Sequence, residues 1–295
     1  MIWLTWRQHR AVLAVTLVAV SALVVWMLVV QHSYSEASHA IARSCIPGQS
    51  YAQNSPCPAY YNQQVSAWEQ ADIIGWLLLA LPILFGVILG APLFAGEFER
   101  KTVILAFTQS LSRTRWMVIR WLIIGLAVVA LASAVAVLSN WWSGQVPTNG
   151  SSLSSRIQPG GSGGFDITGI VPIAYALFAF ALGAALGMVL RRTARAIFGT
   201  VVLLVTARLL FEHYVRAKLA APLFLPVTDN QNQTGFIDPS NFWFVGNGYR
   251  GIQFGNFYQP ASHYWALQWG EAATFTAAAA VLFGLALWSV RRWRA

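Results

Sequence analysis

Apolar residues gather along the chain into six long runs with polar segments between them. The hydrocarbon core of a bilayer is about 30 Å thick, and an α-helix needs roughly 20 apolar residues to cross it. The pattern therefore predicts an all-α polytopic membrane protein with six transmembrane helices, organised as one transmembrane domain over residues 1–295. The predicted spans cover about 11–30, 73–94, 117–138, 167–190, 196–214 and 272–290.

The first run follows Arg7 and Arg10, as the apolar core of a signal peptide would. It is longer than the usual signal core of about 7–15 residues, and no convincing small-residue cleavage motif follows it. We therefore interpret it as a span that is retained.

Only 10% of the residues are charged, whereas about 25% is usual in a soluble domain, and most of the 19 Lys and Arg residues lie at alternate span ends. The basic-rich side of a membrane protein is cytoplasmic, so both termini are predicted inside. The outer segments are then about 31–72, 140–166 and 215–271. Because the positive charges flank spans instead of forming a basic domain, they indicate contact with membrane lipid and no nucleic acid partner.

The two cysteines of the chain, Cys45 and Cys57, both fall in the first predicted outer segment. Disulfides persist outside the cell, so we predict that the two residues form one; the alternative is two free thiols.

The third outer segment contains "NFWFVGNGYRGIQFGNFYQPASHYW", which is crowded with aromatic residues and glycines. Disordered segments are poor in aromatics. We expect this segment to be packed, as short helical or re-entrant elements at the outer interface, where Trp and Tyr are favoured.

Sequence motifs for chemistry are absent. Neither lysine follows a glycine, so the chain has no P-loop and cannot bind ATP by that device. H-E-x-x-H is also missing, and the histidines form no strong metal-binding pattern. We expect no catalytic residues, no metal and no cofactor in this chain.

Arg208 and Glu212 interrupt the fifth span near its outer end. Residues four apart share one helix face, so the two can pair. A charge inside a span costs about 2.5–3.5 kcal/mol on insertion scales. The pair either lines a central cavity or outer gate, or simply snorkels where the span ends.

Glycines four residues apart occur in the second span, Gly86 and Gly90, and in the fourth, Gly183 and Gly187. This spacing permits close helix approach, which we expect within one subunit instead of at a dimer seam.

The N-terminal "MIWLTWRQHR" combines Trp3 and Trp6 with Arg7 and Arg10. This pattern predicts a short interfacial helix on the inner leaflet that leads into the first span, or equally a simple aromatic and basic anchor.

Residues 96–116, "GEFERKTVILAFTQSLSRTRW", lie between two apolar spans on the cytoplasmic side. Val103, Phe107 and Leu111 recur at helical spacing, with acidic residues at the start and basic residues at the end, as the helix macrodipole favours. A solvated loop obeying the positive-inside rule would not require Glu97 and Glu99. We predict a cytoplasmic docking helix.

The stretch "APLFAGEFERKTVILAFTQSLSRTRWMVIRW" resembles the segment after the second span in permeases of the type-2 ATP-binding-cassette (ABC) exporter family, and "WLTWRQHR" is similar to the N-terminus of actinobacterial members. The resemblance covers the six-span layout, but its specific motif only about 30 residues. Lys101 stands where the family often has Gly. By position, the resemblance implies a coupling helix that contacts an ATPase partner through Glu97, Glu99, Arg100, Lys101, Thr102, Thr108, Gln109, Arg113 and Arg115.

The resemblance also implies the partners: two ABC ATPase subunits, which bind ATP and Mg, and a second permease copy or a related permease. The expected function is a permease of an exporter in the plasma membrane of a bacterium, moving an amphipathic small molecule, peptide or lipid outward by alternating access. The alternatives are a non-transporting membrane module, such as an immunity or signalling subunit, and an intramembrane hydrolase.

Overall fold

The computed structural model describes residues 2–45, 56–99, 113–145, 164–226 and 242–292. Six helices among these residues are long and apolar enough to cross a membrane. They are α1 (Ile2–Ser44), α2 (Cys57–Glu99), α4 (Arg113–Trp142), α5 (Val171–Leu190), α6 (Thr193–Tyr214) and α7 (Tyr264–Arg292). The predicted all-α polytopic fold with six spans is therefore confirmed.

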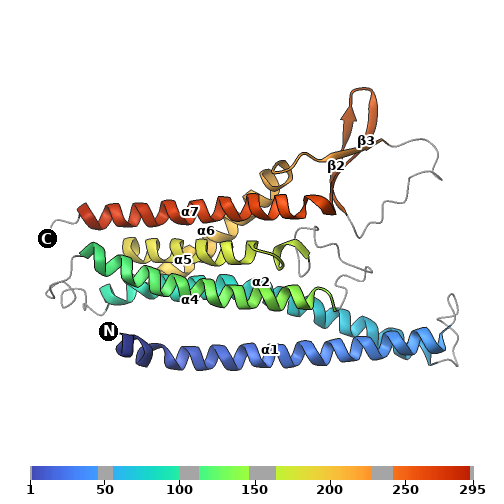
Figure 1. The fold of residues 1–295 in the computed structure, drawn as a ribbon, viewed down its shortest axis with the longest axis horizontal. Coiled ribbons are helices and arrows are strands. Elements are labelled where there is room, and N and C mark those ends of the chain that lie inside the picture. The colour runs from blue at the N-terminus through green and yellow to red at the C-terminus, as the bar shows by residue number, and fades with distance from the viewer. Residues whose placement is uncertain (1, 46–55, 100–112, 146–163, 227–241, 293–295) are drawn as a thin grey trace.

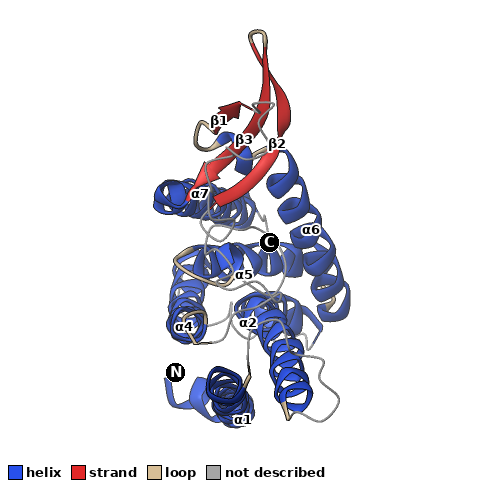
Figure 2. Cartoon of the chain, turned by 90° about the vertical axis from the view of Figure 1, so that its right-hand side faces the viewer, coloured by secondary structure: helices blue, strands red, loops and turns tan. Residues whose placement is uncertain are grey.

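The helices run mainly along the long axis of the bundle, with α6 inclined to the others, and the start of α1 and the end of α7 lie at the same end (Figures 1 and 2). An even number of spans requires this arrangement. The arginine-rich turn between α5 and α6 also lies at that end, which we call the cytoplasmic end, and the disulfide lies at the opposite, outer end.

Helices α1 and α2 each contain 43 residues, far more than a bilayer requires. The predicted outer segment 31–72 is therefore not a long loop with short elements, because most of it continues these two helices. Side chains join them along this extension: Trp26 Nε1 donates to Gln70 Oε1 (3.1 Å), and Gln64 Nε2 donates to Ser38 Oγ (3.2 Å). Such polar contacts allow a helix pair to continue beyond the membrane.

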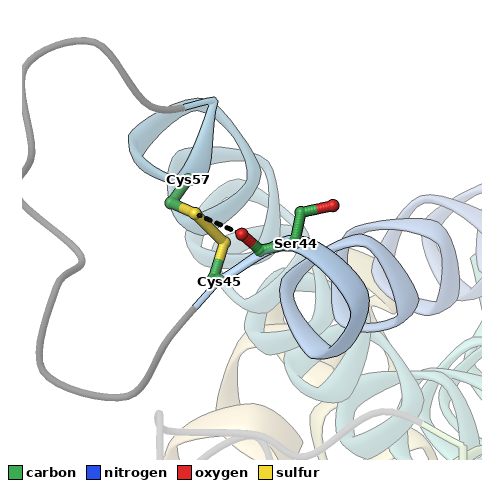
Figure 3. Close-up of a disulfide and its surroundings, with 3 residues drawn as sticks. All are labelled: Ser44, Cys45 and Cys57. Atoms are coloured by element: carbon green, nitrogen blue, oxygen red, sulfur yellow. Dashed lines mark hydrogen bonds between the residues drawn. A yellow bond between two sulfur atoms is a disulfide. The ribbon is translucent and has the colours of Figure 1, made fainter.

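A disulfide between Cys45 and Cys57 closes the outer end of this helix pair, as predicted, with 5.8 Å between the Cα atoms (Figure 3). The carbonyl oxygen of Ser44 lies 3.6 Å from Cys57 Sγ. Because a disulfide sulfur carries no proton, this is a close contact and not a donated hydrogen bond. The bond therefore ties the end of α1 to the first residue of α2.

Helix α5 lies in the middle of the bundle, with α2, α4, α6 and α7 around it (Figure 2). It approaches α2 closely through glycine: a Cβ built on Gly90 would lie 2.5 Å from the carbonyl oxygen of Phe180, and one built on Gly183 would lie 2.9 Å from the backbone nitrogen of Ala91. The glycine spacings thus serve packing within one subunit, as expected.

A small antiparallel sheet stands at the outer end, in the order β1-β3-β2. Its strands are β1 (Leu223–Pro226), β2 (Phe242–Arg250) and β3 (Gln253–Pro260). Arg250 pairs with Gln253 across a two-residue turn, in which Gly251 has φ +65°.

The sheet corrects our expectation of short helical or re-entrant elements in this segment. The expectation that the segment is packed is met, because rings of neighbouring strands contact each other, as Phe224 and Phe257 do at 5.1 Å between centroids. The signal that we overlooked is two runs rich in aromatic residues around a short Gly-containing turn, a pattern typical of a β-hairpin.

Candidate functional site

The last turn of α2, Glu97, Phe98 and Glu99, leads directly into residues 100–112, the predicted docking segment, which lies outside the described residues. The three side chains of this turn contact three other parts of the bundle. We call this set of contacts the cytoplasmic junction; its other members are Arg120, Arg191 and Thr193.

Glu97 joins α2 to α4. It forms an ion pair and a hydrogen bond with Arg120, which stands on the second turn of α4. The Glu97 side chain is 19% exposed and that of Arg120 37%, so water screens the pair only partly. An ion pair of this kind is worth about 1 kcal/mol or less to stability, but it fixes the relative position of two helix ends.

Glu99 joins α2 to the beginning of α6. One carboxylate oxygen accepts the backbone N–H of Thr193 (2.9 Å), and the other accepts the Thr193 hydroxyl (2.9 Å). The first N–H groups of a helix lack partners within the helix, and its N-terminus carries partial positive charge. The N-cap residue of α6, Arg192, provides no side-chain acceptor for these groups. Glu99 of α2 therefore provides one in its place.

Phe98 contacts the turn between α5 and α6. The Arg191 guanidinium carbon lies 5.3 Å from the centre of the Phe98 ring. Arg191 ends α5 with φ +52°, and its N–H donates to the carbonyl of Gly187 (3.1 Å). The left-handed conformation closes α5 and allows α6 to begin two residues later.

The structure brings together only part of the predicted coupling site. Glu97 and Glu99 stand in the junction, and Arg115 is exposed in the first turn of α4. Arg113 begins α4, but its side chain is not described. Arg100, Lys101, Thr102, Thr108 and Gln109 lie outside the described residues, so the docking helix itself stays a prediction.

The predicted interfacial residues Trp3, Trp6, Arg7 and Arg10 all lie within α1, which begins at Ile2 and continues without interruption into the first span. Their side chains are not described, so contact with the inner leaflet stays a prediction.

At the outer end, charged and polar side chains converge in the interior of the bundle. Asp166, Arg216 and Glu271 are fully buried, and Tyr175 is nearly so. They come from four elements: the short helices η1 (Gly164–Asp166) and η2 (Arg216–Lys218), and helices α5 and α7. Together with Arg208 of α6, they form what we call the outer charge cluster.

Arg216 is the centre of the cluster. Its Nε donates to Glu271 Oε2 (2.8 Å), and its NH2 group donates to Glu271 Oε1 (2.9 Å), Asp166 Oδ1 (2.6 Å) and the Tyr175 hydroxyl (3.0 Å). The Tyr175 hydroxyl also donates to Glu271. Burial alone would lower the pKa of the Arg216 guanidinium, but the Asp166 and Glu271 carboxylates raise it above its usual value. Arg216 is therefore permanently charged.

Arg208 and Glu212 are close enough for their charges to interact, but each forms its ion pair with a residue of another element. Arg208 NH2 lies 3.2 Å from Asp166 Oδ2, and Glu212 Oε1 lies 3.8 Å from Arg216 NH1. The correction has a simple physical reason: Asp166 is fully buried and needs positive charge more than the partly exposed Glu212 does. Arg208, 15% exposed, faces into the bundle and does not snorkel outward.

Four members of the cluster were not predicted as site residues from the sequence: Asp166, Tyr175, Arg216 and Glu271. A signal was present, because the chain has only 10 acidic residues and two of them stand at the outer starts of the fourth and sixth spans. Arg216 follows the end of the fifth span at the same level. Opposite charges at the same ends of neighbouring spans are a pattern that favours pairing.

Gln268 of α7 holds the segment that leads into α5. Its side-chain oxygen accepts the N–H groups of Ile170 (3.0 Å) and Val171 (3.1 Å), and its nitrogen donates to the carbonyls of Phe165 (2.9 Å) and Thr168 (3.1 Å). All hydrogen-bonding positions of one buried amide are thus used. Among the described residues, no three His, Cys, Asp or Glu side chains gather as a metal site would require.

The chain was compared with known protein families, curated proteins and solved structures. A family model described as "ABC-2 membrane transporter related" matches residues 14–216, roughly two thirds of the chain. The match includes α2, the cytoplasmic junction and the outer charge cluster except Glu271. Neither a curated protein nor a solved structure gives a significant match.

Proposed function

The chain belongs to the ABC-2 membrane transporter related family and is a permease module of an ABC-type transporter, and from this premise we propose that it is the membrane-spanning subunit of an ATP-driven exporter. Permeases of this family work with a separate ATPase subunit, so the partners include ABC ATPase subunits in the plasma membrane. In the proposed complex two ATPase subunits bind ATP and Mg, and two permease copies, or this chain and a related permease, form the pathway. The cargo would be an amphipathic small molecule, peptide or lipid.

The observation that carries this proposal is the cytoplasmic junction. The chain segment that would receive a push from an ATPase follows Glu99, and the three preceding residues contact α4, the α5–α6 turn and the start of α6. A displacement of residues 100–112 would therefore act on several helix ends together. A contact to one neighbour alone would move only that neighbour.

The outer charge cluster gives the other half of the mechanism. Arg216 of η2, which follows α6, pairs with Asp166 of η1 and Glu271 of α7 in the interior, where a separated charge is costly. These pairs hold the outer ends of α6 and α7 together. We expect these helices to tilt as one body, so that movement of their cytoplasmic ends changes access at both faces. ATP drives such a change only through its different interaction with the inward-open and outward-open states.

The test exchanges the charges of the pair between α2 and α4. The variants are Glu97→Arg, Arg120→Glu and the two together, each purified with its ATPase partner in proteoliposomes. Each single variant places two like charges side by side, and we expect the cargo moved per ATP hydrolysed to fall about 5-fold or more. The double variant restores an ion pair, so most of the coupling should return.

Glu36→Arg is the matched control. Glu36 is an exposed acidic residue of α1 at the outer end, far from the junction, so its reversal should leave transport and hydrolysis unchanged. If both single variants at the junction transport as the control does, Glu97 and Arg120 have no role in coupling.

A separate measurement addresses the partner. The chain is purified from its native membrane in mild detergent, co-purifying proteins are identified by mass spectrometry, and vanadate-sensitive ATP hydrolysis is assayed. We expect a stoichiometric partner that carries a P-loop. Isolation of the chain alone, under conditions that preserve membrane complexes, would favour the non-transporting module.

A further inference from the structure

The β2–β3 hairpin projects from the outer end of the bundle, past α6 and α7 and crosswise to the helices (Figures 1 and 2). Because the helices follow the membrane normal, a hairpin that lies across them extends along the plane of the outer membrane surface. Its turn, Gly251 and Ile252, is the point farthest from the bundle.

One face of the sheet is bound to the protein. Trp243 packs against the hydrophobic core of the helices, and Gln259 is fully buried, where its side-chain nitrogen donates to the carbonyls of Ala217 (3.2 Å) and Ala220 (2.6 Å). These two residues face each other in the pairing of β2 with β3. The hairpin is thus anchored at its base and cannot swing freely.

The opposite face carries large apolar side chains that the described chain covers only in part. The strand register places Leu223, Phe244, Tyr249 and Phe254 on this face, with exposed fractions of 44%, 50%, 72% and 43%. Ile252 at the turn is 98% exposed. We call these five residues the apolar sheet face.

The composition of the hairpin separates it from an ordinary solvated one. The described strands and their turn contain one charged residue, Arg250, and no acidic residue. In an exposed hairpin in water, apolar residues normally alternate with polar or charged ones along each strand, so that the free face is polar. Aromatic residues with a single basic side chain are instead typical of the headgroup region of a bilayer.

Exposed aromatic residues also stand at the outer ends of the two spans next to the sheet. Tyr214 ends α6, and Trp265 and Trp269 stand in the first turns of α7; all three are more than half exposed. Trp and Tyr at the ends of spans mark the level of the interface. Strand β3 ends only four residues before Tyr264, the first residue of α7, so the hairpin leaves the bundle at this level.

From this placement we propose that the β2–β3 hairpin lies on the outer leaflet, with the apolar sheet face in the boundary between headgroups and acyl chains and Arg250 among the lipid phosphates. The occupant of the exposed face is the lipid surface. The hairpin then anchors the outer ends of α6 and α7 to the leaflet. This anchoring does not depend on an ATPase partner.

The test uses a fluorophore at the turn. Both native cysteines are in the disulfide, so a single introduced cysteine is the only reactive thiol. Ile252→Cys is labelled with an environment-sensitive nitrobenzoxadiazole dye, and the full-length protein is placed in nanodiscs of phosphatidylcholine with a minority of phosphatidylglycerol. Because Ile252 has almost no contacts, this substitution does not disturb the fold.

Ala59→Cys is the matched control, an exposed residue at the outer end of α2, next to the disulfide and away from the sheet. We expect doxyl-labelled phosphatidylcholine to quench the dye at residue 252 several-fold more than the dye at residue 59, and iodide in the buffer to show the reverse order. Iodide quenching at both positions with no doxyl quenching at residue 252 overturns the proposal. Protection at residue 252 from both quenchers also overturns it, because a protein partner or a second copy then covers the hairpin.

Discussion

Replacement of Arg216 by methionine is expected to destabilise the folded protein by about 3–5 kcal/mol, the range found when one partner of a buried ion pair is removed. Arg216 is fully buried and donates to Glu271, Asp166 and the Tyr175 hydroxyl. Asp166 keeps Arg208 at 3.2 Å after the substitution, whereas Glu271 keeps only the Tyr175 hydroxyl. One carboxylate is therefore left without positive charge in the interior.

The magnitude can be separated from a general packing defect by a double-mutant cycle. Glu271→Gln alone removes a negative charge and leaves Arg216 with Asp166; we expect this variant to be destabilised as well. The double variant Arg216→Met with Glu271→Gln restores neutrality, since Asp166 and Arg208 still balance each other. Its loss should be smaller than the sum of the two single losses by about 1–3 kcal/mol.

The assay is thermal unfolding in mild detergent, followed by circular dichroism and by tryptophan fluorescence. A loss of this size lowers the melting temperature on the order of 10 °C. Arg43→Met, at an exposed position near the end of α1, is the control for removal of an outer arginine and should melt as the wild type does. Two results would refute the view that charge pairing holds the cluster. One is a double variant whose loss of stability equals the sum of the two single losses, and the other is an Arg216→Met protein as stable as the control.

Two further predictions concern packing and the disulfide. Gly90→Ala should lower the melting temperature, because the new Cβ would lie 2.5 Å from the Phe180 carbonyl oxygen. Gly96→Ala, whose Cβ would have nothing within 4 Å, should raise stability by up to about 1 kcal/mol through helix propensity. Equal shifts of the two variants in thermal unfolding would contradict the close approach of α2 and α5. Cys57→Ser should cost about 3 kcal/mol under oxidising conditions, on the chain-entropy estimate for a closed loop of this size. The loss should vanish when variant and wild type are compared with reductant present, and a difference that persists there would mean that the serine disturbs the fold itself.

The number of spans was readable from the hydrophobic runs, because each run must be long enough to cross the bilayer. The limits of the helices were not readable in this way, since α1 and α2 continue well beyond their apolar runs. The disulfide was readable because the chain has only two cysteines and the predicted topology places both of them on the outer side. The contacts of the cytoplasmic junction were not predicted, because Glu97 and Glu99 were assigned to contact with an ATPase partner, which stays a prediction. Glu97 and Glu99 stood out as acidic residues on a basic side, but the partners Arg120 and Thr193 lie 23 and 94 residues further along the chain.

The sequence by itself determined the environment of each segment. Apolar runs are removed from water into the bilayer, and basic residues stay at the cytoplasmic end. Tertiary structure decided which buried charge meets which. Arg208 and Glu212 share one helix face, yet each has a partner on another element, because the fully buried Asp166 must be neutralised and the packing of η1 and η2 against α5 and α7 brings Arg208 and Arg216 to it. Spacing along one helix reports only neighbours on that helix, whereas the energy of a buried charge depends on every element that surrounds it.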